Sequence, residues 1–419
     1  MVTATAGERH ISMDAVRGFA VLGILLMNIV GMGLPGFAYI DPTYYGGSEG
    51  ANLWTWAVNF VLADGKMRGL FSMLFGASML LVADRAERGS GLSPNQTHYR
   101  RMFWLLVIGL LHGIFLWYGD ILVFYAVAGA LAFPLRKLSA RALIAIGGAV
   151  FVGLIAWGLY KHANLEALNA AAMAPGASAA AMEAWKAASF SLGPPPEALQ
   201  MDLQGFGGGF MDALKQRSMM FFLMHAVIST DEYIEAFSLI LIGAGLFKTG
   251  FFTLGWTTRA YASVIAFGYL VAAPVTAWIA WTIAASGFDA MVTHELSVWT
   301  AAPRIFVALA HAAALMQLIR AGALRWLTER LAAAGRMALS NYVGTSVITM
   351  LVFAGFGLGL FGELQRYQLY FVVAGVWALI LLWSKPWLAR FQYGPLEWVW
   401  RSLVRWSPQP FARPTVAAA

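Results

Sequence analysis

A histidine in the middle of a long apolar segment is the residue of this sequence with the clearest capacity for chemistry. His112 follows Arg101 by 11 residues, or about 16 Å of helix, which places it near the middle of a membrane. Histidine exchanges a proton near neutral pH, so His112 is a candidate general base, and a purely structural hydrogen bond is the alternative. Asp120, at the turn that follows, is a second catalytic candidate, with capping of the next helix as its alternative.

Three polar residues share one stripe of the first apolar segment. At 100° per residue, Asp14, Arg17 and Asn28 fall within about 60° of one another. Because a charge at the bilayer centre costs about 2.5 to 3.5 kcal/mol, this stripe is predicted to face protein or water rather than lipid. Asp14 and Arg17 could form an ion pair at the membrane surface, whereas Asn28 needs a buried partner and is a candidate for stabilising a developing oxyanion.

A third group of polar residues interrupts the second apolar segment. Asp64, Lys66 and Arg68 surround Gly65 between two apolar halves. Irregular backbone at membrane depth persists only against protein or water, so the break predicts a cavity wall, with Asp64 as a catalytic candidate. The alternative is a helix that ends at Ala63, with the charges at the membrane surface.

The composition predicts the elements that position these residues. Of 419 residues, 60% are hydrophobic and 12% are charged, and the mean hydropathy is +0.66, which excludes an ordinary soluble enzyme. We predict an all-α, polytopic integral membrane protein with about ten transmembrane helices, some of them broken. The predicted crossings are at about 14–34, 52–83, 102–118, 121–135, 142–160, 218–248, 260–285, 302–319, 338–361 and 367–388.

The distribution of charge predicts the orientation of these helices. With both termini in the cytoplasm, 20 of the 28 Lys and Arg lie inside, as the positive-inside rule requires. We therefore attribute the net charge of +7 to the cytoplasmic face of a protein that is surrounded by membrane lipids. It is not attributed to nucleic-acid binding. We predict one transmembrane domain over residues 1–400, with a long extracytoplasmic loop at about 161–217 to which we assign no separate domain. We predict that residues 391–419 form a cytoplasmic interfacial helix and tail.

Several chemistries have no basis in this sequence. The absence of cysteine excludes disulfides and thiolate nucleophiles. No pair of histidines has metal-ligand spacing, and neither a phosphate loop nor a Gly-x-Ser-x-Gly elbow occurs, so we predict no metal. Gly355 and Gly359 permit close contact between helices, which leaves a homodimer possible.

Four motifs resemble those of the bacterial YeiB family, long classed as a domain of unknown function. They occur in the same order over nearly the whole chain, at Asp14-x-x-Arg17-Gly18, Gly109 to Leu122, Gly335 to Tyr342, and Phe391 to Arg401. The resemblance implies a multi-pass protein of the bacterial cytoplasmic (inner) membrane.

The first two crossings also resemble a wider superfamily of transmembrane acyltransferases that includes heparan-alpha-glucosaminide N-acetyltransferase. Residues like those of that enzyme's N-terminal motif stand at Asp14, Arg17, Gly18, Asn28 and Asp64. Where the enzyme has a histidine 11 positions after the asparagine, this sequence has Tyr39. We therefore assign the base to His112, on the grounds of its depth and chemistry.

The resemblance implies a membrane acyltransferase. Its donor would be a cytoplasmic acyl-CoA, most simply acetyl-CoA, and its acceptor a hydroxyl or amine at or across the membrane. Guanidinium groups suit the coenzyme A phosphates; the candidates are Arg17, Arg100, Arg101 and Arg336, with Arg85 and Arg136 as further possibilities.

An enzyme and a carrier predict different cavities. An acyltransferase predicts one tunnel in which Asn28, Asp64 and His112 converge near a basic cytoplasmic mouth. The alternative is a secondary transporter or channel for a small polar or anionic solute, which predicts two vestibules and a site at the membrane midplane. A scaffold or sensor without turnover is a third possibility.

Overall fold

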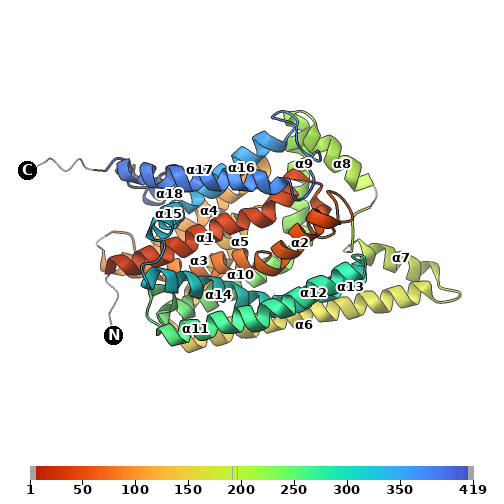
Figure 1. Cartoon of the computed structure of the whole chain (residues 1–419), viewed down its shortest axis with the longest axis horizontal. Coiled ribbons are helices and arrows are strands. Elements are labelled where there is room, and N and C mark those ends of the chain that lie inside the picture. Colours follow the sequence, from red (N-terminus) through yellow and green to blue (C-terminus); the bar gives the residue numbers. More distant parts are fainter. Residues whose placement is uncertain (1–5, 90, 191, 196, 414–419) are drawn as a thin grey trace, which may run out of the picture.

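The computed structural model describes residues 6–89, 91–190, 192–195 and 197–413, and over these residues the chain is all-α (Figure 1). The helices are α1 (Ala6–Gly33), α2 (Gly50–Leu62), α3 (Lys66–Arg88), α4 (Pro94–Phe115), α5 (Leu122–Ala132), α6 (Ala140–Met173), α7 (Ala179–Ser189), α8 (Glu197–Gly207), α9 (Phe210–Leu223), α10 (Thr230–Lys248), α11 (Thr258–Phe267), α12 (Ala273–Ala285), α13 (Ala290–Trp299), α14 (Ala301–Arg320), α15 (Arg325–Arg336), α16 (Ala338–Phe353), α17 (Leu369–Arg390) and α18 (Pro395–Arg405). Single π-helical turns, Met224–Ile228 and Gly268–Ala272, join α9 to α10 and α11 to α12.

Within the described part of the chain, six helical segments are long and apolar enough to cross a membrane. They are Ile11–Gly33, Gly50–Arg88, Ala140–Met173, Thr258–Ala285, Ala301–Arg320 and Leu369–Arg390. These match six of the ten predicted crossings and identify a membrane protein. The other four predicted crossings fall on α4, α5, α9 with α10, and α16, and they remain predictions.

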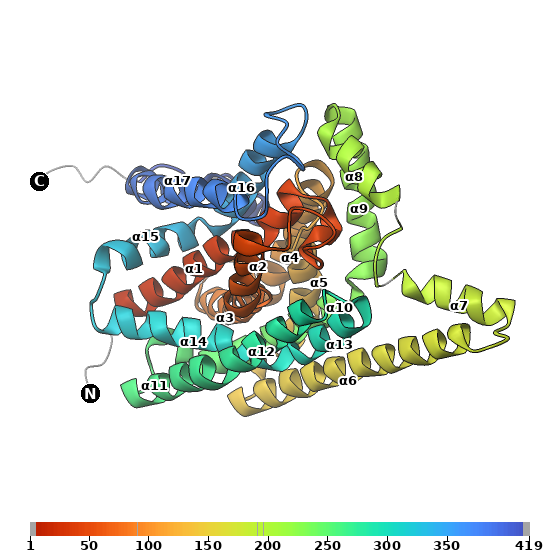
Figure 2. The same ribbon diagram turned by 45° about the vertical axis from the view of Figure 1, so that its right-hand side comes forward.

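Helix α1 lies in the centre of the bundle (Figure 1). It packs against α3, α14, α15, α16 and α17, and its apolar stretch is mostly buried. Helix α6 runs along the edge of the bundle (Figure 2), and its apolar stretch is mostly exposed, as expected for a helix that faces lipid. The central position of α1 places the stripe of Asp14, Arg17 and Asn28 against other helices.

The second predicted crossing is broken at the position that the sequence indicates. Helix α2 ends at Leu62 and α3 begins at Lys66, and Gly65 between them has a φ of 69°, which suits glycine. The Lys66 side chain is 1% exposed and its ammonium group donates a hydrogen bond to the carbonyl oxygen of Phe60. The charge of Lys66 at the break therefore faces protein.

The segment predicted as the long extracytoplasmic loop, residues 161–217, is largely helical. Helix α6 continues to Met173, α7 and α8 follow, and α9 begins at Phe210. The alanine-rich composition of this segment suits helices, because alanine has the highest helix propensity. Helix α18 lies in the segment predicted as an interfacial helix, and its position at the membrane surface stays a prediction; residues 414–419 of the predicted tail lie outside the described residues.

Glycines allow two pairs of helices to pack backbone to backbone. A Cβ atom at Gly18 of α1 would lie 2.0 Å from a carbonyl oxygen of α15, and one at Gly335 of α15 would lie 1.8 Å from a carbonyl oxygen of α1. Gly76 of α3 and Gly243 of α10 stand in the same relation, each with 2.0 Å to a carbonyl oxygen of the other helix. A larger side chain at these positions must separate the helices.

We expect Gly76→Leu to destabilise the protein strongly, because the new side chain would collide with backbone that cannot rotate away. The expected cost is about 3 kcal/mol or more, seen as a lower midpoint of thermal unfolding in detergent. Gly148→Leu is the matched control, since a Cβ there meets nothing within 4 Å on helix α6. Equal midpoints for the two variants would contradict this account of the packing.

Candidate functional site

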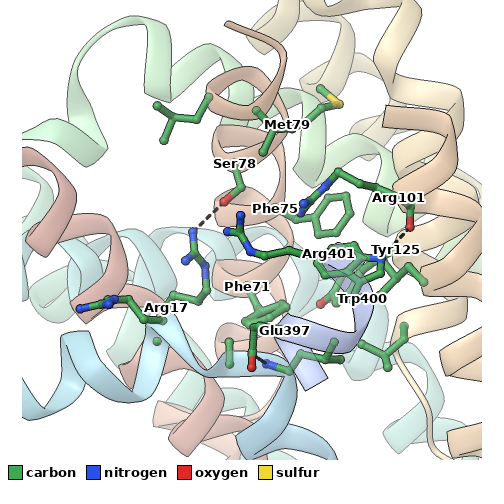
Figure 3. A pocket seen from close by; sticks show the side chains of 18 of the residues that line it. Arg17, Phe71, Phe75, Ser78, Met79, Arg101, Tyr125, Glu397, Trp400 and Arg401 are labelled. Carbon is green, nitrogen blue, oxygen red and sulfur yellow. Dashed lines mark hydrogen bonds between the residues drawn. The ribbon is translucent and has the colours of Figure 1, made fainter. Parts of the chain in front are cut away.

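A cavity of about 410 Å³ lies at the end of the bundle where α1 begins and α18 is found (Figure 3). Helices α1, α3, α4, α5, α16 and α18 contribute to its wall. Five guanidinium groups line it, from Arg17, Arg85, Arg101, Arg336 and Arg401. The acidic residues of the lining are Asp14 and Glu397, so positive charge predominates. We call this space the arginine cavity.

The arginines differ in how far they are held in place. Arg17 donates a hydrogen bond to Ser78 Oγ at 2.7 Å (Figure 3). It donates another to Asp14 Oδ1 at 2.8 Å, which confirms the predicted pair with Asp14. Arg85 and Arg336 are exposed, at positions where a ligand entering from water would meet them first. The cavity therefore combines a fixed inner cation with accessible outer ones.

Aromatic side chains form much of the remaining wall. The guanidinium of Arg101 lies 4.0 Å from the ring centroid of Trp400, and the Trp400 indole donates a hydrogen bond to the carbonyl oxygen of Arg101 at 3.1 Å (Figure 3). Phe75 stacks on Tyr125 at 5.5 Å between centroids, beside Phe71. Such a wall suits a ligand with an anionic head and an apolar stem.

Glu397 connects α18 to the beginning of α16. Its Oε1 accepts hydrogen bonds from the backbone N–H of Leu339 at 2.7 Å and of Ser340 at 3.1 Å, and its Oε2 accepts one from Ser340 Oγ at 2.5 Å. The carboxylate thus caps a helix from another part of the chain and satisfies N–H groups that have no partner within α16. Burial raises the pKa of Glu397 above its ordinary value.

His112 lies at the centre of a buried hydrogen-bonded relay, which we call the His112 relay. Its Nδ1 lies 2.8 Å from Asp120 Oδ1, and its Nε2 lies 2.8 Å from Ser346 Oγ. All three side chains are buried. The other oxygen of Asp120 accepts a hydrogen bond from the N–H of Val123 at 2.8 Å, so Asp120 both orients the imidazole and caps the start of α5.

Ser346 is the member of this relay that the sequence analysis did not identify. It is 234 positions from His112, and nothing in the local sequence of α16 distinguishes it from the neighbouring small polar residues. Only packing brings α16 beside α4 at this point.

Asn28, Asp64 and His112 were predicted to converge in one tunnel, and none of them lines the arginine cavity. His112 is separated from it by Tyr342, which does line the cavity and whose ring centroid lies 4.9 Å from that of the imidazole. The charged side chains at membrane depth instead form separate hydrogen-bonded networks.

Asp64 is paired with the residue that replaces the superfamily's histidine. Tyr39 donates a hydrogen bond to Asp64 Oδ1 at 2.5 Å. Asn28 is half-buried, and its side chain forms no hydrogen bond with another described residue. Neither Asn28 nor Asp64 is therefore placed to contact a ligand in the arginine cavity.

The remaining charges at the broken crossing form a closed network. Arg68 donates to Glu232 at 2.5 Å and to Glu235 at 2.8 Å, and Arg304 donates to Glu235 at 2.5 Å. A pocket beside them has a volume of only about 10 Å³. Paired charges with no space for a ligand are typical of a structural network that joins α3, α10 and α14.

Three of the four arginines predicted to bind a donor line the arginine cavity. Arg17, Arg101 and Arg336 do so, whereas Arg100 points to α18, where its guanidinium lies 3.5 Å from the carbonyl oxygen of Val404. Arg85 and Arg401 complete the lining, and Arg136, the other predicted residue, is absent from it. Over the described ranges, no group of three or more His, Asp and Glu is positioned to hold a metal ion.

The fold and the cavity define a polytopic α-helical membrane protein with an arginine-lined internal site. Residues 246–407 match the model of a family described as a protein of unknown function (DUF418). The chain is 30% identical to the uncharacterised protein YeiB of Escherichia coli (strain K12), over 94% of this chain and 96% of that protein. It is 26% identical to the uncharacterised protein YxaH of Bacillus subtilis (strain 168), over 97% of both chains. The chain belongs to the YeiB family, as its four motifs predicted.

We expect Glu397→Ala to lower the stability by about 1 to 2 kcal/mol, because the N–H groups at the start of α16 lose their acceptor. Glu397→Gln keeps one acceptor oxygen and should cost less. The measurement is the thermal unfolding midpoint in detergent.

The pH dependence of the stability distinguishes the hydrogen bonds that Glu397 accepts from the effect of its charge. A carboxyl whose pKa is raised by folding binds its proton more tightly in the folded state, so its contribution to stability falls as the pH rises through the folded-state pKa. The wild type should therefore lose stability relative to Glu397→Gln as the pH rises from about 4.5 to 7. A difference that does not change with pH would contradict the raised pKa.

Proposed function

We propose that this protein is an acyl-CoA-dependent acyltransferase of the bacterial cytoplasmic membrane. It would have about ten transmembrane helices and both termini in the cytoplasm. The observation that carries the proposal is the arginine cavity, at the end of the bundle where positively charged residues gather. By the positive-inside rule this end faces the cytoplasm, where coenzyme A is found.

The charges of the cavity suit an anionic donor. Five guanidinium groups face two carboxylates, of which that of Asp14 is paired with Arg17 and that of Glu397 accepts hydrogen bonds from α16. Net positive charge is therefore left for phosphates, which guanidinium forks bind well. The exposed Arg85 and Arg336 would hold the nucleotide end at the mouth.

The apolar part of the cavity wall suits the pantetheine arm of the donor. Phe71, Phe75 and Leu105 line its wall, and Ile121 and Leu122 lie directly after Asp120 in the chain. A volume of about 410 Å³ is within the usual range for small-molecule sites. A pantetheine arm that enters from the mouth would bring its thioester toward Tyr342 and the His112 relay.

The His112 relay supplies the base that acyl transfer requires. A carboxylate only accepts hydrogen bonds, so Asp120 holds the proton of the neutral imidazole on Nδ1 and leaves Nε2 free to accept one. Removal of a proton from the attacking group by a positioned histidine contributes typically 10² to 10⁴ in rate. The acceptor, a hydroxyl or an amine, would be one at or across the membrane.

A transporter is the alternative, and the charges at membrane depth favour it. Arg68, Glu232, Glu235 and Arg304 resemble the buried ionic groups of carriers. Their ion pairs with one another and the pocket of about 10 Å³ beside them argue for a structural role instead. A carrier would move an anion across proteoliposomes without consuming acetyl-CoA.

We expect Arg101→Ala and Arg336→Ala each to weaken the binding of coenzyme A about tenfold, because each removes a charge-assisted hydrogen bond worth about 1.4 kcal/mol or more. The measurement is titration of purified protein followed by tryptophan fluorescence, since Trp400 lines the cavity. Arg100→Ala is the matched control, because Arg100 adjoins Arg101 but lies outside the lining. Equal affinities for all three variants, or no binding by the wild type, would remove the support for the donor site.

We expect His112→Ala to lower the rate of coenzyme A release from acetyl-CoA by a factor of about 10² to 10⁴. Membrane extracts serve as the source of acceptor, and the free thiol is measured. His225→Ala is the control, since that imidazole bonds to the hydroxyl of Tyr233 and lines neither the arginine cavity nor the pocket of about 10 Å³. Normal turnover by His112→Ala would refute the assignment of the base.

A further inference from the structure

The His112 relay has the geometry of an activated serine. Asp120, His112 and Ser346 are joined by two contacts of 2.8 Å through the two nitrogens of one imidazole. With the proton of the neutral ring on Nδ1, Nε2 has the lone pair to accept a hydrogen bond from Ser346 Oγ, whose longer contact is with the carbonyl oxygen of Tyr342 at 3.5 Å. This order of carboxylate, imidazole and hydroxyl is the arrangement that turns serine into a nucleophile.

A small cavity lies against Ser346 on the side away from the arginine cavity. Its volume is about 30 Å³, and Ser346, Trp117 and Arg217 are part of its lining. One water needs about 10 to 15 Å³ of such space, so there is room for a group of two or three heavy atoms. An acetyl group is of this size.

Two hydrogen-bond donors stand in the lining of this small cavity. The indole Nε1 of Trp117 is buried and has no hydrogen-bond partner among the described residues. The Arg217 guanidinium is also buried, and one of its nitrogens donates to the carbonyl oxygen of Phe115 at 2.6 Å. A buried donor without a partner is costly in a folded protein, and an oxyanion beside Ser346 would satisfy it.

The relay separates the two cavities. On one side Tyr342 contacts the imidazole and lines the arginine cavity, and on the other Ser346, one turn further along α16, lines the small cavity. Acylation of Ser346 from the arginine cavity requires the ring of Tyr342 to move aside. The acyl group would then leave toward the opposite end of the bundle.

We propose that Ser346 is a catalytic nucleophile that carries the acyl group from donor to acceptor as an ester. This inference rests on the proposed function. It adds a covalent intermediate and a route: donor on the side of the arginine cavity, and acceptor on the side of the small cavity.

The two half-reactions balance without a metal or a further reactant. In the first, Ser346 Oγ gives its proton to His112 Nε2 and attacks the thioester carbonyl; the carbon–sulfur bond breaks, and the thiolate takes the proton from His112 and leaves as coenzyme A. In the second, an acceptor hydroxyl or amine gives its proton to His112 and attacks the ester. The bond to Ser346 Oγ breaks, and that oxygen takes the proton back. Trp117 would stabilise the oxyanion in both steps.

The acylation step can be tested without the acceptor. Full-length protein in lipid nanodiscs is mixed with radiolabelled acetyl-CoA, quenched with acid and digested. We expect release of about one equivalent of coenzyme A and one acetyl group on the peptide that contains Ser346. Ser346→Ala should lose the label and, with membrane extracts as acceptor, turn over on the order of 10³-fold more slowly.

Two further variants keep the test decisive if Ser346→Ala folds poorly. Thr345→Ala is the control and should label as the wild type does, since its hydroxyl bonds only to the backbone oxygen of Asn341. Ser346→Cys should take a label that neutral hydroxylamine removes, as expected for a thioester but not for the wild-type ester. A fluorophosphonate probe, which reacts with activated serines, should modify the wild type but neither Ser346→Ala nor Asp120→Asn.

The outcomes distinguish the two proposals. Release of coenzyme A to an acceptor by an unlabelled wild type, with turnover retained in Ser346→Ala, would overturn the nucleophile and leave the acyltransferase standing. A wild type that reacts with the fluorophosphonate but neither binds nor consumes acetyl-CoA would overturn the acyl-CoA donor and keep Ser346 as a nucleophile for another substrate. No reaction with either reagent would overturn both.

Discussion

Polar groups inside a membrane protein must find their partners within the protein, and this constraint accounts for most of the side-chain arrangement. The start of α16 obtains its acceptor from Glu397 of α18, and the charges at the broken crossing satisfy one another. Each of these contacts joins helices far apart in the sequence. The network therefore holds the bundle in one arrangement as well as satisfying its polar atoms.

Against this background the unpaired groups are informative. The arginine cavity retains more cations than anions, and the small cavity beside Ser346 retains an indole N–H without a partner. Other buried atoms, such as Trp104 Nε1 and Arg366 Nε, also have no partner among the described residues, but that of Trp117 belongs to a residue that lines a cavity together with Ser346. The two cavities lie on opposite sides of the His112 relay.

The site is built from both halves of the chain. The matched family model covers residues 246–407, which include Arg336, Ser346 and Glu397, whereas His112 and Asp120 belong to the preceding part. The relatives YeiB and YxaH align over nearly their whole length, so they retain both parts. A function for this family therefore has to be sought in the whole chain, and the shared C-terminal region alone contains an incomplete relay.

The sequence by itself determined the membrane environment, the family, the break at Gly65 and the helical hairpin that carries His112 and Asp120, because hydropathy, turn residues and spacing are local properties. It also indicated which arginines gather at one end, since the positive-inside rule acts on sequence. Only the tertiary structure decided that Ser346 lies within hydrogen-bond distance of His112 and that Tyr39 donates a hydrogen bond to Asp64. It also decided that Asn28 is not part of the lining of the arginine cavity. These pairings depend on which faces of distant helices touch, and the close approach at glycines such as Gly76 sets that geometry.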